Sequence, residues 1–507
     1  MSVAPQPREK GCEKEIDDKT KEVKTISSYR QTIWKSKTEK KMKRCHDYAE
    51  LDLFSECGEN AVTEKVLWDE FLCNDVLTND LSELNFTIRA AADRCLIDLN
   101  RAQLYVRGKI VKKDGSETER SKVAPVNNFL HSMFEDCTVF LNDIEVSHAN
   151  KLYPYSSYFL DLFETTNEAK ESYMTAQLWH KNGAFNSTDI GMNPGFAWRA
   201  GWFGNREHGM IGKLHSDLFQ QDRYLLNGVE VKVKLSLGKP GFFLMSNERK
   251  KVPKKKTETN DTTTTDDKTE NNDETTNDDE EEDGPLVDND FYKFKITDAK
   301  MYVPYVHVSD KAMDDIEKQL EKKPAVYPIQ RLVTKAIPIN ARTQEHLLEN
   351  ISKGQLPNKM IVGLVSTKAK QQDLSQSPFF FGSYNVKKIE VNVDGMPYSK
   401  RALTPDTSKG AYTKTYMNMF ESLNYIQEGA NTPVISSENF RYGYALYPFN
   451  LNPGPATDPG IFKKTGNVNI YLEFEESVRC EDLQLVVMCV YDKTIKIDNE
   501  RNFTKDW

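Results

Sequence analysis

The sequence lacks the short motifs that mark the common classes of enzyme and nucleotide-binding protein. It contains no HExxH zinc motif, no GxxxxGK[ST] phosphate-binding loop and no GxSxG nucleophile elbow. Its eight histidines include no pair one residue apart, which the metal site of a cupin enzyme requires. We therefore expect a protein that is not an enzyme and has no catalytic, cofactor-binding or metal-binding residues.

Two features resemble sites only weakly. Residues 201–209 are glycine-rich, but they contain no lysine to meet a phosphate, so loop geometry explains them better. His208 and His215 flank a short apolar stretch, and we assign them a surface or capping role rather than a metal site. Several aromatic residues are expected in the core or in subunit contacts rather than as base-stacking platforms: Trp198, Trp202, Phe379, Phe380, Phe381, Tyr442 and Tyr444.

Cysteines and long apolar runs are also scarce. The eight cysteines form no CxxC pair, and several lie in apolar surroundings, so we expect reduced structural thiols and an intracellular folding compartment. The N-terminus has no apolar signal core, and no apolar run is long enough to cross a bilayer. We expect a soluble protein that is neither secreted nor inserted into a membrane.

The acidic balance of the chain comes from one segment. Residues 257–283 carry thirteen acidic residues and one lysine, and removing their net −12 from the chain's −9 leaves +3. This segment has no apolar residue to offset the loss of chain entropy, so we expect a disordered surface loop within residues 251–290.

The first 50 residues form a lysine-rich N-terminal arm. One interpretation is a solvated, mobile tail. The other is an arm that contacts nucleic acid or acts as a nuclear import signal, because clustered positive charges raise the affinity for phosphate without reading a base sequence. The residues that would make such a contact are Lys35, Lys37, Lys40, Lys41, Lys43 and Arg44.

An internal repeat is the most informative feature that is present. Residues 155–164 and 412–421 align without a gap, and each has apolar residues at the spacing of a short amphipathic helix. A strand-like segment closed by a turn pair precedes each helix, with Asn142-Asp143 in one copy and Asp394-Gly395 in the other. Alternating strands at 229–237 and 468–474 follow in the same order. We infer a duplicated domain.

The rest of the chain predicts mainly short strands with few helices. This pattern is typical of antiparallel β-sandwiches of the jelly-roll or immunoglobulin type, and helices inserted in the long connections favour the jelly roll. A linker helix is expected at residues 311–325, with Met313, Ile316 and Leu320 at helical spacing. The other expected strands are 84–88, 96–99, 103–110, 137–146, 291–296, 359–365, 389–393 and 483–491.

A set of segments spread over the chain forms one recognisable pattern. The segments are residues 124–134, 139–142, 212–219, 223–231, 244–246, 354–357, 361–365, 377–379, 393–395, 441–446 and 495–501. Together they resemble the major capsid proteins of Polinton (Maverick) elements and their adintovirus relatives. The resemblance runs from about Leu51 to Trp507, and neither the lysine-rich arm nor the acidic segment belongs to its pattern.

The resemblance implies an all-β double jelly roll, two eight-stranded sandwiches in tandem. Its expected parts are the arm at 1–50, a first jelly roll at 51–310, the linker helix at 311–325 and a second jelly roll at 326–507. The implied function is that of a structural major capsid protein, which forms homotrimers that act as pseudo-hexagonal capsomers of an icosahedral shell around double-stranded DNA. A minor capsid or penton protein would close the vertices, and the protein would be found in the virion after assembly in the host nucleus or cytoplasm.

The same resemblance suggests where the two unusual segments lie. If strands 229–237 and 291–296 are the seventh and eighth of the first jelly roll, the acidic segment between them is expected on the particle exterior. The arm is then the better candidate for the inner face, near packaged DNA. Two alternatives remain, a ligand-binding β-sandwich of lectin-like or domesticated host type and a cupin-type enzyme.

Overall fold

The computed structural model describes residues 62–506 apart from 79–80, 93, 120–121, 148–149, 183–185, 204–205, 247, 254–280, 289, 341, 343, 372, 399–401, 408, 427–434, 453–463 and 476–481. Residues 62–507 form one compact unit. The lysine-rich arm and most of the acidic segment lie outside the described residues. Because both halves of the described chain belong to one compact unit, the domain boundaries expected from the sequence stay predictions.

The first half of the described chain forms a sandwich of two antiparallel sheets, which we call the first sandwich. Numbered by their order along the chain, its eight principal strands lie in the order 1-8-3-6 in one sheet and 2-7-4-5 in the other, which is the strand order of a jelly roll. The first sheet holds β1 (Thr63–Leu72), β13 (Tyr292–Val308), β4 (Gln103–Lys112) and β8 (His208–Lys213), and the second holds β2 (Glu83–Ile88), β9 (Val231–Leu237), β6 (Phe134–Leu141) and β7 (Ile144–Glu145).

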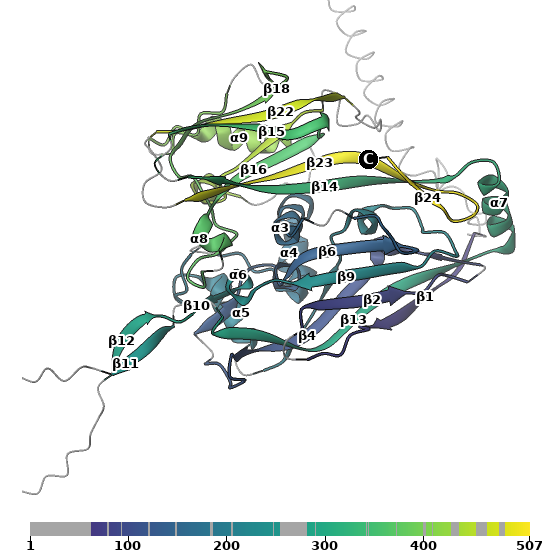
Figure 1. Ribbon diagram of the computed structural model, residues 1–507, viewed down its shortest axis with the longest axis horizontal. Helices are drawn as coiled ribbons and strands as arrows, with labels where there is room; N and C mark the ends of the chain where they lie inside the picture. The colour runs from purple at the N-terminus through teal and green to yellow at the C-terminus, as the bar shows by residue number, and fades with distance from the viewer. Residues whose placement is uncertain are drawn as a thin grey trace, which may run out of the picture. The chain divides into compact units, whose positions relative to one another are not determined.

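The second half forms a second sandwich with the same strand order, 1-8-3-6 and 2-7-4-5. The duplication inferred from the sequence is thus confirmed at the level of topology, and the fold is a double jelly roll (Figure 1). Its sheets hold β14 (Ala325–Ile339), β23 (Leu483–Ile497), β16 (Lys359–Ser366) and β21 (Leu446–Asn450) in one, and β15 (Glu345–Gln355), β22 (Thr465–Phe474), β18 (Val386–Val393) and β19 (Met396–Pro397) in the other.

Short elements complete both sandwiches. The short strands are β3 (Cys95–Ile97), β5 (Val123–Pro125), β10 (Leu244–Ser246), β17 (Phe381–Gly382), β20 (Tyr442–Gly443) and β24 (Phe503–Lys505). The helices are α2 (Phe129–Ser132), α3 (Tyr153–Glu164), α4 (Asn167–Glu171), α5 (Pro194–Phe203), α6 (Pro240–Phe243), α7 (Asp310–Leu320), α8 (Thr367–Lys370), α9 (Thr413–Ser422) and α10 (Ser437–Arg441), with 3-10 turns η1 (Leu99–Arg101), η2 (Tyr173–Gln177) and η3 (Asp217–Gln220).

The alternation that predicted the strands reflects burial on one face of each sheet. In β9, Val231, Val233 and Leu235 are buried and the lysines between them are partly exposed. In β22 the buried residues fall at every second position from Val468 to Phe474. Burying one face of a two-residue repeat fixes the register of each strand, because a slip of one residue would turn the apolar side chains outward.

The turn pairs of the repeat have the same backbone geometry. Asn142 and Asp143 have φ values of 41° and 66°, and Asp394 and Gly395 have φ values of 51° and 80°. Two successive residues with positive φ are the requirement of a type I′ hairpin turn, which matches the twist of the flanking strands. Each hairpin is followed by the predicted helix, α3 in the first sandwich and α9 in the second.

The linker helix α7 joins β13 to β14 at one end of the sandwiches (Figure 1). It ends at Leu320, and its Met313 and Leu320 side chains are buried. No helix within the described residues is long and apolar enough to span a bilayer.

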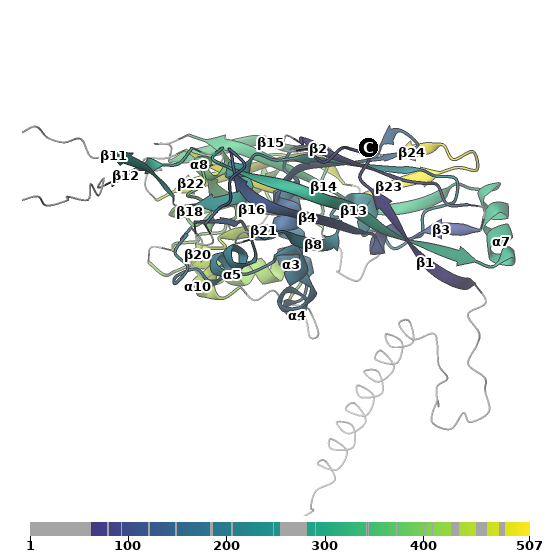
Figure 2. The same cartoon turned by 90° about the horizontal axis from the view of Figure 1, so that it is seen from below.

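Two expectations for the first sandwich need correction. Strand β13 extends to Val308, well beyond the predicted 291–296, because it pairs with β1, β3 and β4 along its length. The expected disordered loop at 251–290 is wrong at both ends, since β11 (Arg249–Pro253) pairs with β12 (Glu281–Leu286). The hairpin extends away from both sandwiches in two views (Figures 1 and 2).

Candidate functional site at the junction of the two sandwiches

Helix α3 lies at the junction of the two sandwiches, where it packs against β6 of the first and β14 of the second. Every residue from Tyr153 to Phe163 is buried, so the amphipathic stripe predicted for this helix is wrong. Some of its polar side chains have partners inside the protein, as Ser156 does: its Oγ lies 2.7 Å from Thr334 Oγ1 on β14. The matching helix α9 keeps the predicted stripe, with Met419 and Phe420 buried and Met417 exposed.

Aromatic rings join α3 to the second sandwich. Tyr158 stacks on Phe379 with ring centroids 4.2 Å apart, and Phe159 packs on Phe381 at 5.2 Å. The sequence left open whether these phenylalanines lie in the core or in subunit contacts, and the structure places Phe379 and Phe381 in the core. The other aromatic residues named from the sequence divide differently: Tyr444 is buried, whereas Trp198, Trp202 and Tyr442 are exposed.

Arginine side chains form polar bridges across the junction. Arg331 of β14 donates hydrogen bonds to the carbonyls of Val146 and Ser147, at 3.2 and 3.1 Å. It also lies 3.9 Å from the carboxylate of Asp217, whose pKa is raised to about 6 by burial despite the opposing positive charge of Arg331. Arg501 donates to the carbonyl oxygen and side-chain oxygen of Asn227 at 2.8 and 2.7 Å. These contacts fix the sandwiches in one relative orientation.

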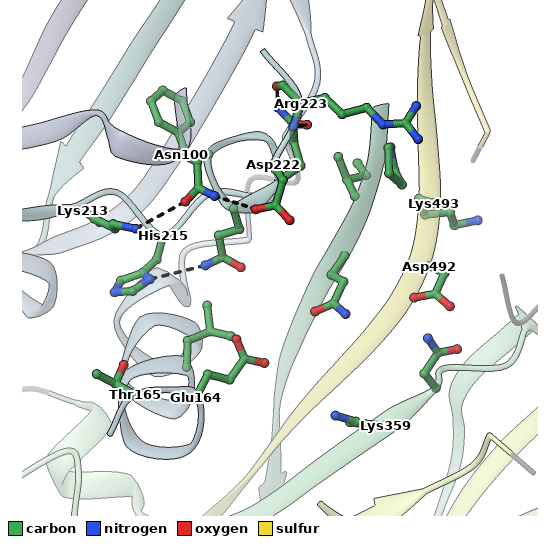
Figure 3. Close-up of a pocket in the computed structure, with 18 of the residues that line it drawn as sticks. Asn100, Glu164, Thr165, Lys213, His215, Asp222, Arg223, Lys359, Asp492 and Lys493 are labelled. Atoms are coloured by element: carbon green, nitrogen blue, oxygen red, sulfur yellow. Dashed lines mark hydrogen bonds between the residues drawn. The ribbon is translucent and has the colours of Figure 1, made fainter. Parts of the chain in front are cut away.

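An open cleft of about 860 Å³ lies at the junction and is lined by residues of both sandwiches (Figure 3). Asn100 connects charges of opposite sign on one wall: it accepts from Lys213 at 3.3 Å and donates to Asp222 at 2.9 Å. The other charged side chains of the cleft are Glu164, Arg223, Lys359, Asp492 and Lys493. Because the cleft carries both positive and negative side chains, it could bind either an anionic or a cationic group.

A buried polar cluster lies beside the cleft and reaches it through His215. The Nε2 atom of His215 lies 3.0 Å from Oδ1 of Asp161, but the N–H is not directed at that oxygen in hydrogen-bond geometry. The ring of His131 packs against that of His215 with centroids 4.5 Å apart. His131 and Asp161 are buried, and the side chain of His215 is 13% exposed.

The neighbours of the cluster fix its protonation. Burial lowers the pKa of His131 to about 3, and the adjacent His215 acts in the same direction, so the His131 ring is neutral at physiological pH. Burial acts to raise the pKa of Asp161, but the neighbouring His215 and the hydrogen bond from Asn128 outweigh it and hold this pKa below its ordinary value. Asp161 is therefore a carboxylate that faces two imidazole rings.

The surface or capping role expected for His215 is wrong, because its ring faces a buried carboxylate. His208 is partly buried on β8, where its ring contacts those of Trp202 and Phe203. Sequence patterns did not single out His131 or Asp161, although His131 and His215 both lie in segments that carry the family resemblance and Asp161 lies in the repeated helix. The predicted DNA-contacting residues, which run from Lys35 to Arg44, lie outside the described residues.

Apolar side chains are exposed along β1, a strand that pairs only with β13 among the described residues. We call the exposed side chains of Val66, Trp68 and Leu72, which lie at alternate positions and so point to one side of the sheet, the β1 face; they are 37%, 49% and 61% exposed. An unpaired strand edge with apolar side chains is prone to associate with another chain.

Comparisons with known proteins bear on the fold. No family model matches the sequence. A Caenorhabditis elegans protein described as uncharacterized protein F54H12.2 is 24% identical over 402 residues, which cover 78% of this chain and 85% of that protein.

Two solved structures share the fold over nearly the whole chain. A chain of the Sputnik virophage, determined by cryo-electron microscopy, has a TM-score of 0.58 and 11% identity, with 92% of each chain covered. The crystal structure of the mavirus major capsid protein has a TM-score of 0.52 and 11% identity, with 91% of this chain and 93% of that chain covered. At these identities the likeness establishes the double jelly-roll fold.

Proposed function

We propose that this chain is a major capsid protein with a structural, non-catalytic role. The observation that carries the proposal is the presence of two jelly rolls with identical strand order in one compact unit. The likeness in fold to the mavirus major capsid protein supports it. Subunit association requires complementary surfaces rather than reactive side chains.

The duplicated fold has a direct use in such an assembly. Three copies of a chain with two similar sandwiches present six similar units around a threefold axis, so a homotrimer can act as a pseudo-hexagonal capsomer and tile an icosahedral shell. This use requires the two sandwiches of one chain to keep a fixed orientation. The aromatic stack of Tyr158 on Phe379 and the hydrogen bonds of Arg331 provide that rigidity.

We assign the β1 face to the contact between neighbouring copies of the chain. Burying its apolar side chains and unpaired edge against a second copy would remove from water a surface that is unfavourable in a monomer. Among capsid proteins, we infer that the chain is related to those of Polinton elements and adintoviruses, because it carries the sequence segments named above. In this assignment the shell encloses double-stranded DNA and a separate protein occupies the vertices.

Assembly of the purified full-length protein tests the proposal. Mass photometry should show trimers, and electron microscopy should show shells or capsomers. Trp68→Lys should reduce trimer formation at least tenfold, whereas Tyr442→Lys, the same kind of change at a side chain 53% exposed, should leave it unchanged. Thermal unfolding of each variant checks that the monomer remains folded.

The outcomes separate the alternatives. A protein that remains monomeric over a wide concentration range and forms no particles would contradict the capsid role and favour a ligand-binding β-sandwich. If the Trp68→Lys variant still forms trimers, the assignment of the β1 face to the subunit contact is wrong, but the proposed capsid role is not affected. If residues 1–61 rather than a second copy cover this face, their removal should expose it and change the oligomeric state.

The proposed contact of the N-terminal arm with DNA has its own test. A variant lacking residues 1–45 should assemble but should protect less DNA from nuclease than the full-length protein. Normal packaging by this variant would refute the role of the arm and leave the capsid role intact.

A further inference from the structure

We propose that His131, Asp161 and His215 form a binding site for a divalent transition-metal ion of the zinc class. One potential ligand atom from each of the three residues lies within 4.8 Å of the other two. Two imidazole nitrogens and a carboxylate oxygen are ligands that Zn²⁺ commonly takes in proteins. This proposal departs from the sequence-based expectation of no metal ligand, and it does not depend on the capsid role.

The free nitrogen of each imidazole ring is the one that faces the cluster. His131 Nδ1 lies 2.9 Å from the hydroxyl of Tyr153, and His215 Nδ1 lies 3.4 Å from the amide nitrogen of Gln220. His131 Nε2 is buried and has no hydrogen-bond partner among the described residues, and His215 Nε2 lies 3.0 Å from Asp161 Oδ1 without hydrogen-bond geometry. A buried nitrogen without a partner is unfavourable by itself, and one cation would satisfy both nitrogens and the carboxylate.

Neighbouring side chains hold the proposed ligands in place. Asp161 Oδ2 accepts hydrogen bonds from the amides of Asn128 at 2.7 Å and Gln177 at 3.0 Å, which leaves Oδ1 toward the histidines. The Tyr153 hydroxyl, besides contacting His131, accepts from the backbone N–H of His215 at 3.3 Å. Outer hydrogen bonds at the second ring nitrogen of a ligating histidine and at the second oxygen of a ligating carboxylate are typical of metal sites, and His131 and Asp161 have them.

The site has a route to solvent and a free coordination position. His215 lines the cleft of Figure 3, so an ion could reach the cluster from the cleft after a rotation of that ring. Three protein ligands leave a fourth tetrahedral position for water. Asp161 Oδ1 and His215 Nε2 lie 3.0 Å apart, close to the separation of neighbouring ligand atoms around a tetrahedral zinc ion with Zn–N bonds of about 2.0–2.1 Å.

The ion would act as a structural staple. It would join α2, which carries His131, to α3, which carries Asp161, and to the segment between β8 and η3, which carries His215. Because α3 is buried at the junction, the staple would stiffen the contact between the sandwiches. In the second sandwich Asn418 occupies the position of Asp161 in the repeat, and the described residues of that sandwich contain no matching cluster.

Metal titration of tag-free, full-length protein after EDTA dialysis tests this site. The wild-type protein should bind one Zn²⁺ per chain by mass spectrometry and isothermal titration, and Zn²⁺ should raise its unfolding temperature. Co²⁺ should give the visible absorption of a tetrahedral complex. Asp161→Asn and His215→Asn should each weaken binding at least tenfold, about the smallest effect expected for altering a metal site.

Matched variants keep the test decisive. His180→Asn and His208→Asn change other partly buried histidines and should leave the stoichiometry and the Co²⁺ spectrum unchanged. If Asp161→Asn fails to fold, the His215→Asn variant provides the test of metal binding. His215 lies at the cleft between β8 and η3, outside the buried helix α3. Less than about one tenth of an equivalent of metal on the wild-type protein, or equal affinity in His215→Asn, would overturn the proposal.

Discussion

Tyr158 and Phe379 stack face to face across the junction of the two sandwiches, with ring centroids 4.2 Å apart and an angle of 3° between the ring planes. One ring belongs to a helix of the first sandwich and the other to a segment that precedes β17 in the second. Both rings are buried. The two sandwiches therefore share part of one hydrophobic core, and we expect them to unfold together.

Replacing Phe379 by alanine should lower the free energy of unfolding by about 3–5 kcal/mol, because the change removes a buried ring and leaves a cavity at the junction. Chemical denaturation followed by tryptophan fluorescence and circular dichroism measures this change. Tyr442→Ala, at an exposed aromatic residue, should change stability by about 0.5 kcal/mol or less. Two separate transitions in the wild-type protein would contradict the shared core.

Replacing Arg331 by alanine should destabilise the protein by about 3 kcal/mol. The change removes hydrogen bonds to the Val146 and Ser147 carbonyls and leaves the buried Asp217 without a nearby positive charge. Arg94→Ala is the matched control, because Arg94 pairs with Asp310 on the surface and its side chain is 65% exposed. The control should lose about 0.5 kcal/mol or less, and equal losses in both variants would refute the argument.

Two glycines of α5 should respond in opposite directions to alanine. A Cβ on Gly195 would lie 2.4 Å from the Lys181 carbonyl oxygen, so Gly195→Ala must displace the backbone and should destabilise. A Cβ on Gly201 would have nothing within 4 Å, so Gly201→Ala should stabilise the helix by about 0.5–1 kcal/mol. Thermal unfolding of the two variants under one condition checks the sign of each effect.

Stability should fall on acidification partly because of His180. Burial first, and then the charges of Arg199 and His208, lower the pKa of His180 to about 4. The unfolded chain, with an ordinary histidine pKa of about 6.5, binds this proton at a higher pH than the folded protein does. The contribution of His180 is therefore present above about pH 6.5 and is lost as pH falls toward 4.

The variant His180→Gln isolates this effect. From about pH 7 to pH 5 the wild-type protein should lose about 1 kcal/mol more stability than the variant, an amount reduced by the partial exposure of the ring. Urea denaturation at several pH values measures the difference. A difference between the two proteins that does not change with pH would refute the prediction.

The repeat and most strands could be predicted because their causes are local. Period-two burial in β9 and β22 and the paired positive-φ residues Asn142-Asp143 leave clear marks in the sequence. The burial of α3 could not be predicted in this way. Its Ser156 and Asp161 suggest a solvent-facing side, but they have partners far away in the chain, as Thr334 is for Ser156 and Asn128 is for Asp161.

The buried cluster was missed for the same reason. His131, Asp161 and His215 come from two helices and a loop, and no spacing rule relates them. The cupin motif that the sequence lacks places two histidines on one strand. Its absence therefore says nothing about metal ligands that come from three separate elements. Long-range contacts of this kind become visible only when the fold brings the segments together.

The hairpin of β11 and β12 gives the chain a natural attachment point for foreign sequence. Pro253 and Glu281 are paired residues on adjacent antiparallel strands, so the segment between them leaves and rejoins the protein at nearly the same place. Extending a connection whose ends are already held together costs little conformational entropy. An epitope or an affinity peptide placed between these two residues should be displayed without disturbing either sandwich.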